Sequence, residues 1–226
     1  MGLQQKLDAF KAEFLRTARA GRPALYETKI EELRASFALD RAIRTGEQAP
    51  EFTLPDALTG KPVSSTDLLA LGPLVIKFFR GRWCPYCVTE LEIWRDLHAE
   101  VRGTGAFLIA ISPQTRRHND FTLQQHYLPF PILSDTDAKV ADQFGIAYSV
   151  PQAHRDYYKG ILVNIPFVNS GNMYKSATEA SWRLPLPAIF VVGQDGTIAF
   201  SEGHADFRVR PEPADVLEGV VSAVKR

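Results

Sequence analysis

The chain contains only two cysteines, Cys84 and Cys87, which lie three positions apart in the run Trp83-Cys84-Pro85-Tyr86-Cys87. Such a pair could form a structural disulfide, half of a metal site, or a dithiol that cycles between reduced and oxidised forms. A structural zinc site needs four ligands, and the five histidines show no ligand spacing. A disulfide across so short a loop adds little stability, because the stabilisation grows with loop length. We therefore interpret the pair as a redox-active dithiol.

The elements expected around the cysteines place the pair at the start of a helix. Residues 74–79 form a nearly all-apolar run, typical of a strand buried on both faces. Residues 88–101 have apolar side chains at helical spacing, and Pro85 suits a first helical turn. A thiol there faces unpaired backbone N–H groups and the positive end of the helix dipole, which favour the reactive thiolate. Arg80 and Arg82 flank the motif and would lower the thiol pKa further if they point inward.

A proline far along the chain supports this interpretation. Pro187 immediately precedes the apolar run 188–192. If the bond before Pro187 is cis, as we expect, the proline would lie opposite the cysteines and leave the backbone of Leu186 free to align a thiol-bearing partner. The alternative is an ordinary trans proline at the start of a strand.

The order of the predicted elements indicates the fold class. The expected strands and helices alternate: strands at 74–79, 106–111, 129–133, 188–192 and 197–200, and helices at 88–101, 119–127, 137–144 and from Pro213 onward. This alternation, ending in a hairpin and a helix, predicts an α/β sheet. Gly145 is expected to end the helix over 137–144 in the left-handed conformation.

Two segments lie outside this pattern. Residues 1–45 are predicted to be a separate helical extension with two apolar stripes, at Leu3, Leu7, Phe10 and Phe14 and at Leu25, Ile30, Leu33 and Phe37. The stripes could pack on this chain or on a second copy, and a homodimer is our expectation. Residues 150–184 are too long for an ordinary loop and too apolar for disorder, so we predict a partly helical insertion that covers a functional region.

Composition excludes several partners. Lys plus Arg and Asp plus Glu both total 26, so the formal net charge is zero, and no basic excess indicates binding to nucleic acid or an anionic membrane. No apolar run is long enough to span a bilayer, and the N-terminal residues do not read as a signal peptide. We expect a cytoplasmic protein with no cofactor and no metal.

From Gly46 to the end, about four-fifths of the chain, the sequence resembles the peroxiredoxin family, the alkyl hydroperoxide reductase/thiol-specific antioxidant group. The matching runs are Gly46-X-X-Ala49-Pro50-X-Phe52-X-Leu54, Leu74 to Phe79, Cys87-Val-Thr89-Glu90-Leu91, Ala110-Ile-Ser-Pro-Gln114, Phe130-Pro-Ile-Leu-Ser-Asp135 and Asp195-Gly196. In detail it resembles a redoxin-like branch that carries Arg-Gly-X-Trp-Cys-Pro-Tyr-Cys. The resemblance implies a thioredoxin fold over residues 46–226 and thiol-dependent reduction of hydrogen peroxide or organic hydroperoxides.

The departures from the family pattern concern the site. Peroxiredoxins carry Pro-X-X-X-Thr-X-X-Cys, and aligning the reactive cysteine on Cys87 puts Cys84 at the Thr position and Arg80 at the Pro position. The family's activating arginine falls on Pro187. The family register therefore favours Cys87 as the attacking thiol, whereas the usual logic of Cys-X-X-Cys motifs favours Cys84, nearer the helix end and more exposed. We expect Cys84 to attack and Cys87 to resolve.

Several further residues are candidates for supporting roles. Glu90, one turn past Cys87, could shuttle a proton or hold Arg80 or Arg183, or it could be a helix-surface carboxylate. Trp83 belongs to the motif itself.

Three functions are compatible with these residues. The leading prediction is a thiol peroxidase that is recharged by a thioredoxin- or glutaredoxin-type donor. The alternatives are a thiol–disulfide oxidoreductase, favoured by the Trp-Cys-Pro-X-Cys run with Pro187, and a non-enzymatic redox sensor, favoured by the amphipathic extension.

Overall fold

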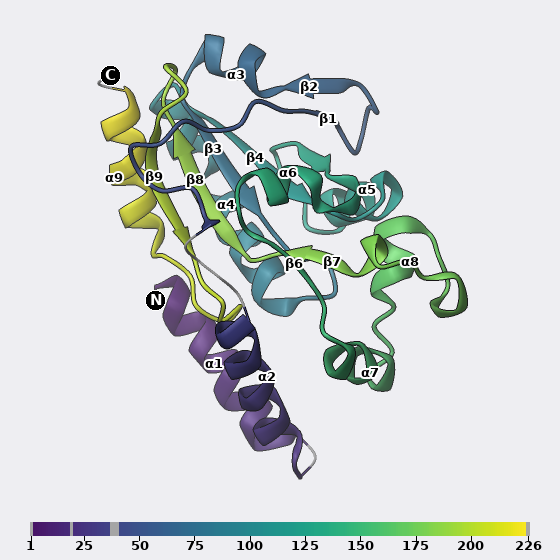
Figure 1. The fold of residues 1–226 in the computed structure, drawn as a ribbon. Helices are drawn as coiled ribbons and strands as arrows, with labels where there is room; N and C mark the ends of the chain where they lie inside the picture. Colours follow the sequence, from purple (N-terminus) through teal and green to yellow (C-terminus); the bar gives the residue numbers. More distant parts are fainter. Residues whose placement is uncertain (1, 19, 37–40, 225–226) are drawn as a thin grey trace.

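A five-stranded mixed sheet forms the centre of the molecule (Figure 1). The structure is a computed structural model that describes residues 2–18, 20–36 and 41–224, and of Leu25, Lys29 and Ser36 only the backbone. The strands of the sheet, in spatial order, are β5 (Ile132–Ser134), β4 (Phe107–Ser112), β3 (Leu74–Phe78), β8 (Ala188–Val192) and β9 (Ile198–Gly203). β3, β4 and β5 run parallel to one another, whereas β8 is antiparallel to both β3 and β9.

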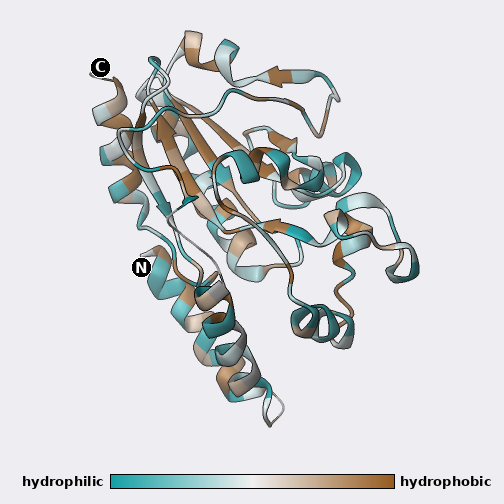
Figure 2. Cartoon of the chain, viewed as in Figure 1, coloured by the Kyte–Doolittle hydropathy of each residue, from teal (hydrophilic) through white to brown (hydrophobic). Residues whose placement is uncertain are grey.

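The central strand β3 determines what lies beneath the cysteines. Side chains of a strand alternate between the two faces of the sheet. Leu74, Ile76 and Phe78 pack into one apolar layer and Val75 into the other, and the sheet strands are brown in the hydropathy colouring of Figure 2. The alternation therefore places Lys77 on the same face as Val75, where its side chain is 1% exposed.

Helices cover both faces of the sheet. The layer on the Val75 face takes apolar side chains from three helices: α1 (Leu3–Thr17), α4 (Pro85–Gly103) and α9 (Pro213–Val224). The opposite layer takes them from α2 (Arg22–Ser36), α3 (Ser65–Leu71) and α6 (Lys139–Gln143). α5 (Arg116–Gln125) connects β4 to β5, and β1 (Thr53–Pro55) pairs with β2 (Pro62–Ser64) in a separate hairpin. The predicted α/β alternation and the closing hairpin are confirmed.

The predicted and observed bounds of the helices and strands differ by a few residues, and one of these differences concerns the cysteines. The helix expected at 88–101 begins at Pro85, so Cys87 lies in its first turn. Gly145 follows α6 with a φ of 71°, the left-handed conformation predicted for it. A side chain there would also collide with the backbone of Arg41, since an added Cβ would come 1.8 Å from the Arg41 carbonyl oxygen.

The N-terminal helices pack on the rest of the chain through part of their predicted stripes. Leu3 and Leu7 are fully buried, but Phe10 is 45% exposed, because α1 extends beyond the sheet. Ile30 and Leu33 of α2 are also buried. Of the remaining expected stripe residues, Phe14 is half-buried, and Phe37 and the side chain of Leu25 lie outside the described residues.

The segment 150–184 is partly helical, as expected. It contains α7 (Gln152–Gly160), α8 (Ile165–Ser170) and short 3-10 turns, and it returns through β7 (Arg183–Pro185), which pairs with β6 (Ala147–Ser149). It has a small apolar cluster of its own that includes Tyr158 and Trp182 and packs against Trp83. Within the described ranges, no helix is both long and apolar enough to cross a lipid bilayer.

The expected cis bond before Pro187 is wrong, because no peptide bond of the described residues is cis. The Leu186 backbone N–H donates to the carbonyl oxygen of Ile146 at 2.8 Å. This bond continues the pairing of β6 with β7, so the Leu186 N–H is already used within the fold and is not available to align a partner.

Candidate active site

Cys84 and Cys87 occupy two different positions at the start of α4. Cys84 is the N-cap residue and Cys87 is the third residue of the helix. The chain reaches them from β3 through Gly81, whose φ is 149° and where an added Cβ would come 2.6 Å from Trp83 Nε1, so only glycine fits. Both thiols are free and buried, with exposed fractions of 2% for Cys84 and 0% for Cys87. Cys84 is therefore not the exposed thiol that was expected.

Three hydrogen-bond donors converge on the Cys87 sulfur. Burial raises the pKa of Cys87, but the bond donated by the Cys84 thiol, the charges of Arg210 and Arg80, and the Arg80 backbone N–H together lower this pKa to about 6. Arg210 Nη2 lies 3.7 Å from the sulfur. Hydrogen bonds and cations that favour the charged form lower a pKa, and here they exceed the effect of desolvation. Cys87 is thus a thiolate at neutral pH.

Cys84 has the opposite character. Burial raises its pKa well above that of an ordinary thiol, and the bond that it donates to Cys87, together with the negative charge there, raises the pKa further. The Arg80 side chain partly opposes this, with Nη1 at 3.9 Å from the Cys84 sulfur. At neutral pH the pair therefore holds one proton, which resides on Cys84.

A buried ion network supports the site from below. Glu90 of α4 is 1% exposed, and its two oxygens face Lys77 Nζ at 2.6 Å and Arg210 Nε at 2.5 Å. The Lys77 contact is an ion pair rather than a directed hydrogen bond, since neither of its two atoms has a hydrogen-bond partner. Burial lowers the pKa of Lys77, and the charge of Arg210 adds to this, while Glu90 opposes it. Glu90 therefore holds Arg210 against Cys87.

Arg80 is buried in a ring of aromatic side chains. It is 2% exposed, its guanidinium lies over the rings of Phe207 at 4.2 Å and Trp83 at 4.7 Å, and it donates a hydrogen bond to the Tyr158 hydroxyl. Its Nε has no hydrogen-bond partner, and no described carboxylate pairs with it. Cation–π contacts contribute roughly 0.5–2 kcal/mol each, whereas burying one charge costs several kcal/mol. The aromatic rings therefore do not replace a counter-charge.

A narrow pocket adjoins Arg80 on the side that carries the helical extension and the insertion. Its volume is about 20 Å³. The pocket is lined by Tyr26, Ile30, Leu33, Arg80, Tyr148, His154, Tyr157, Tyr158 and Phe207. Three otherwise separate parts of the chain thus meet here: α2, the segment from β6 into α7, and the loop after β9.

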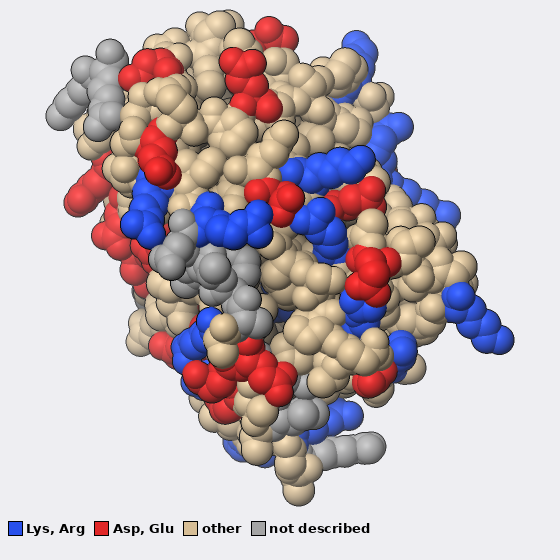
Figure 3. All heavy atoms as spheres, in the orientation of Figure 1, with Lys and Arg blue, Asp and Glu red and all other residues tan. Residues whose placement is uncertain are grey.

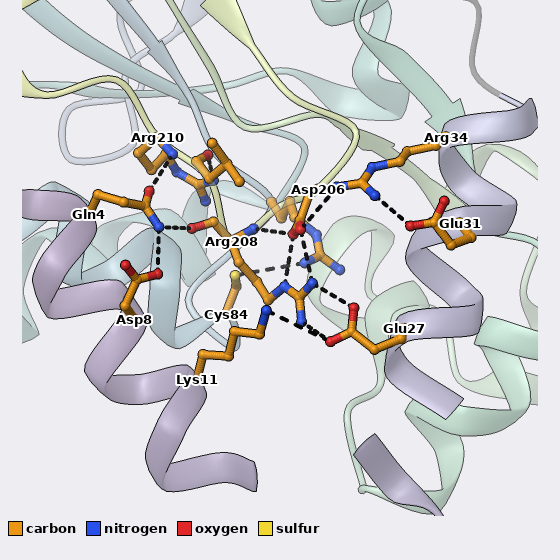
Figure 4. A network of polar contacts seen from close by, with 12 residues as sticks. Gln4, Asp8, Lys11, Glu27, Glu31, Arg34, Cys84, Asp206, Arg208 and Arg210 are labelled. Carbon is orange, nitrogen blue, oxygen red and sulfur yellow. Dashed lines mark hydrogen bonds and ion pairs between the residues drawn. The ribbon is translucent and has the colours of Figure 1, made fainter. Parts of the chain in front are cut away.

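The N-terminal helices also hold the loop that carries Arg210 (Figure 4). From α1, the Gln4 side chain accepts from the Arg210 backbone N–H at 3.1 Å and donates to the Arg208 carbonyl at 3.4 Å. From α2, Glu27 forms a two-bond ion pair with Arg208 at 2.7 and 3.0 Å. Arg208 in turn binds Asp206. The two helices thus bind the loop from opposite sides.

The predicted site residues divide into those that face the thiols and those that do not. Arg80, Trp83 and Glu90 lie at the site, but Glu90 is buried and binds Lys77 and Arg210 rather than Arg80 or Arg183. Arg183 pairs instead with Asp142 at 2.8 Å. The predicted pairing of Glu90 with Arg80 or Arg183 is therefore wrong.

Arg82 does not point inward. Its side chain is exposed and lies over the Phe121 ring at 4.6 Å. It therefore does not contribute to the low pKa of Cys87, in contrast to the buried Arg80 two residues earlier.

Two important residues were missed in the sequence. Lys77 is a single charge in an otherwise apolar strand, and such a residue needs a buried acid partner when both sheet faces are covered, so it could have been found. Arg210 carries no such signal, because it lies in a loop and more than 120 positions from Cys87. Within the described part of the chain, no cluster of three or more His, Cys, Asp or Glu side chains could hold a metal ion.

Known proteins resemble this chain in sequence and in structure. Peroxiredoxin Bcp of Escherichia coli is 31% identical over 104 residues, which cover 46% of this chain and 65% of that protein. The chloroplastic peroxiredoxin Q of Arabidopsis thaliana is 31% identical over 104 residues, 46% of this chain and 47% of the relative. The crystal structure of peroxidoxin BcpB from Mycobacterium tuberculosis superposes with a TM-score of 0.58 at 22% identity, over 80% of this chain and 97% of that one.

The structural matches identify the fold, and the sequence profile identifies the family. The structural similarity confirms the predicted thioredoxin fold, with the mixed central sheet flanked by helices. The sequence profile of the AhpC/TSA family matches residues 45–201, which contain both cysteines and Glu90 but end before Arg208 and Arg210. The chain belongs to the AhpC/TSA family, as the match over residues 45–201 shows.

Proposed function

We propose that the protein is a thiol peroxidase in which Cys87 attacks the hydroperoxide and Cys84 resolves the product. The observation that carries the assignment of Cys87 is the convergence of three donors on its sulfur, which lowers its pKa to about 6. Only a thiolate is an effective nucleophile. Membership of the AhpC/TSA family and relatives named peroxiredoxins support the peroxidase activity.

The first step forms a sulfenic acid. The Cys87 thiolate attacks the outer oxygen of the O–O bond, which breaks to give Cys87–SOH and the alkoxide or hydroxide of the substrate. The proton held by Cys84 can pass to this leaving oxygen. Arg210 and Arg80 face the developing negative charge, and cations placed there before the reaction stabilise it without reorganisation.

The second step closes the disulfide. Loss of its proton makes Cys84 a thiolate, which attacks the Cys87 sulfur and releases hydroxide that leaves as water. Cys84 is well placed, since its thiol already hydrogen-bonds Cys87. A thioredoxin- or glutaredoxin-type dithiol then reduces the disulfide, and the pair takes up two electrons and one proton to regenerate the Cys87 thiolate and the Cys84 thiol. We propose the reducing cytoplasm as the location of this cycle, and a homodimer as its oligomeric state, with the exposed Phe10 of α1 at the interface.

Single-turnover oxidation tests this proposal. Reduced protein is mixed with hydrogen peroxide or cumene hydroperoxide, and sulfenic acid is trapped with a dimedone-type reagent in Cys84→Ser and Cys87→Ser variants. Oxidation far faster than that of free cysteine, with sulfenic acid trapped on Cys87 in the Cys84→Ser variant, is the expected result. Trapping on Cys84 instead would reverse the assignment of the two thiols.

An assay with glutathione disulfide, run beside the peroxide assay, separates the proposal from the thiol–disulfide oxidoreductase alternative. A wild-type protein that reacts with peroxide no faster than free cysteine, yet reduces glutathione disulfide, would be a thiol–disulfide oxidoreductase. The Trp-Cys-Pro-X-Cys run at the start of α4 is the feature that favours that alternative.

A further inference from the structure

We infer that oxidation of the dithiol draws one small monovalent anion, of the size of chloride, into the pocket beside Arg80. The inference rests on the proposed dithiol–disulfide cycle, but not on peroxide being the oxidant. The pocket and its lining residues are those described above, between α2, α7 and the loop after β9.

The two buried arginines, Arg80 and Arg210, differ in their negatively charged neighbours. Arg210 has a permanent carboxylate partner in Glu90, at 2.5 Å. For Arg80, no described carboxylate lies within ion-pair distance, although its side chain is 2% exposed. Its negative neighbour in the reduced protein is the Cys87 thiolate, which accepts a hydrogen bond from the Arg80 backbone N–H, while the neutral Cys84 thiol lies 3.9 Å from Arg80 Nη1.

Oxidation removes that negative charge. The Cys87 thiolate and the Cys84 thiol become a neutral disulfide, and one proton and two electrons leave, the electrons passing to a hydroperoxide or to glutathione disulfide. After this step Arg210 still faces Glu90, whereas Arg80 faces only aromatic rings and phenol groups. A buried cation without a counter-charge is unfavourable, so the oxidised protein gains by taking up an anion.

The pocket offers suitable donors for such an anion. Arg80, Tyr148 and Tyr158 all line the pocket, and the Tyr158 hydroxyl accepts a hydrogen bond from Arg80, which leaves its own hydrogen free to donate. The volume of about 20 Å³ exceeds what a single water needs and excludes large organic anions. The site therefore selects a small monovalent anion by both charge and size.

The test is the chloride dependence of the thiol–disulfide equilibrium. The full-length protein is equilibrated with glutathione buffers at fixed pH and at constant ionic strength, with chloride replacing the bulkier gluconate. An anion bound by the disulfide form alone shifts the equilibrium toward disulfide, by up to tenfold for each tenfold rise in chloride, or about 30 mV in reduction potential.

Two arginines that are two positions apart provide a matched pair of variants. Arg80→Met is expected to abolish the chloride dependence, and Tyr158→Phe, which removes one donor, to weaken it. Arg82→Gln, at the exposed arginine over Phe121, is expected to keep the dependence of the wild type. In addition, chloride-35 NMR should show line broadening with the oxidised protein that exceeds the broadening with the reduced protein.

Three outcomes would overturn the inference: no chloride dependence in the wild type, an unchanged dependence in Arg80→Met, or its loss in Arg82→Gln. Because glutathione sets the equilibrium, the measurement does not involve peroxide. A protein that shows the chloride shift but reduces no hydroperoxide would refute the peroxidase proposal and leave the anion site intact.

Discussion

At the scale of single residues, the two cysteines differ because of what surrounds each sulfur. Both are buried, and burial by itself disfavours a thiolate. Cys87 nevertheless receives donors from Cys84, from the Arg80 backbone and from Arg210, whereas Cys84 is itself one of those donors. The hydrogen-bond donors around the sulfur, and not its exposure, therefore make Cys87 the proposed nucleophile.

The pH dependence of the Cys87 reaction follows from this arrangement. In wild type the rate of peroxide reduction or iodoacetamide alkylation should rise with pH to a plateau, with a midpoint near the pKa of about 6. Below the midpoint the thiol is protonated and the rate should fall about tenfold for each pH unit. Cys84→Ser, which keeps a hydrogen-bond donor, should retain a low midpoint, and Cys84→Ala should raise it.

These profiles can be measured by stopped-flow alkylation and by thiolate absorbance near 240 nm. Equal midpoints in the Ser and Ala variants would show that the Cys84 hydrogen bond does not hold down the pKa of Cys87. The Cys87→Ser variant, in which Cys84 is the remaining thiol, is expected to react slowly throughout the same pH range.

Glu90 is the one carboxylate between two buried cations. Glu90→Gln leaves Lys77 without its carboxylate and Arg210 with only the Cys87 thiolate as a negative neighbour. Removing one partner of a buried ion pair typically costs about 3–5 kcal/mol in the free energy of unfolding. Lys77→Met leaves Glu90 paired with Arg210 and should cost clearly less. Urea denaturation of the reduced proteins measures both. A larger loss in Lys77→Met than in Glu90→Gln would contradict this account of the network.

At the scale of elements, the helical extension belongs to the site. α1 and α2 bind the loop over residues 204–212, and that loop carries Arg210 to Cys87. The loop and most of the extension lie outside residues 45–201, the part matched by the family profile. The arginine beside the thiolate therefore comes from a region that the family profile does not match.

Two glutamate variants, Glu27→Gln and its control Glu13→Gln, test whether the helical extension positions Arg210. Glu27→Gln weakens the ion pair with Arg208 and should loosen the loop, which raises the pKa of Cys87. Its alkylation rate at a pH near that pKa should then fall, by roughly twofold for a rise of half a pH unit. Glu13→Gln is the control, since Glu13 pairs with the exposed Arg16 on the same helix. Identical pH profiles for both variants would show that the α2 contact is merely structural.

At the scale of the whole molecule, both sulfurs are covered although the enzyme must exchange electrons with a partner. The cover consists of α1, the loop after β9 and the insertion, and acidic and basic side chains are interspersed over the face shown in Figure 3. A protein reductant therefore reaches the disulfide only after part of this cover moves, whereas a small reagent needs less opening.

Leu7 provides a test of this cover. It is fully buried between α1 and α4, and Leu7→Ala should lower the free energy of unfolding by about 2–5 kcal/mol. It should also accelerate labelling of the thiols by a bulky maleimide more than by iodoacetamide. Ala12→Gly, at an exposed position of the same helix, controls for a general loosening of α1. An equal acceleration for both reagents would argue against α1 as a size-selective cover.

The sequence by itself determined the local features of this protein. The alternating runs predicted the α/β sheet, the Trp-Cys-Pro-Tyr-Cys run identified the redox pair, and the family pattern indicated the thioredoxin fold. Each of these signals is contained in a short stretch, because strand and helix periods and helix-start motifs are local properties.

Only the tertiary structure decided how the site is charged. Arg210 contacts Cys87 although the two are 123 positions apart. Glu90 pairs with Lys77 and Arg210 and not with Arg80 or Arg183. The bond before Pro187 is trans. Hydrophobic patterning tells which side chains are buried, but not which distant charge each will face. The pKa values of Cys84 and Cys87 depend on those distant partners within a few ångströms, so the attacking thiol could be proposed only once the chain was folded.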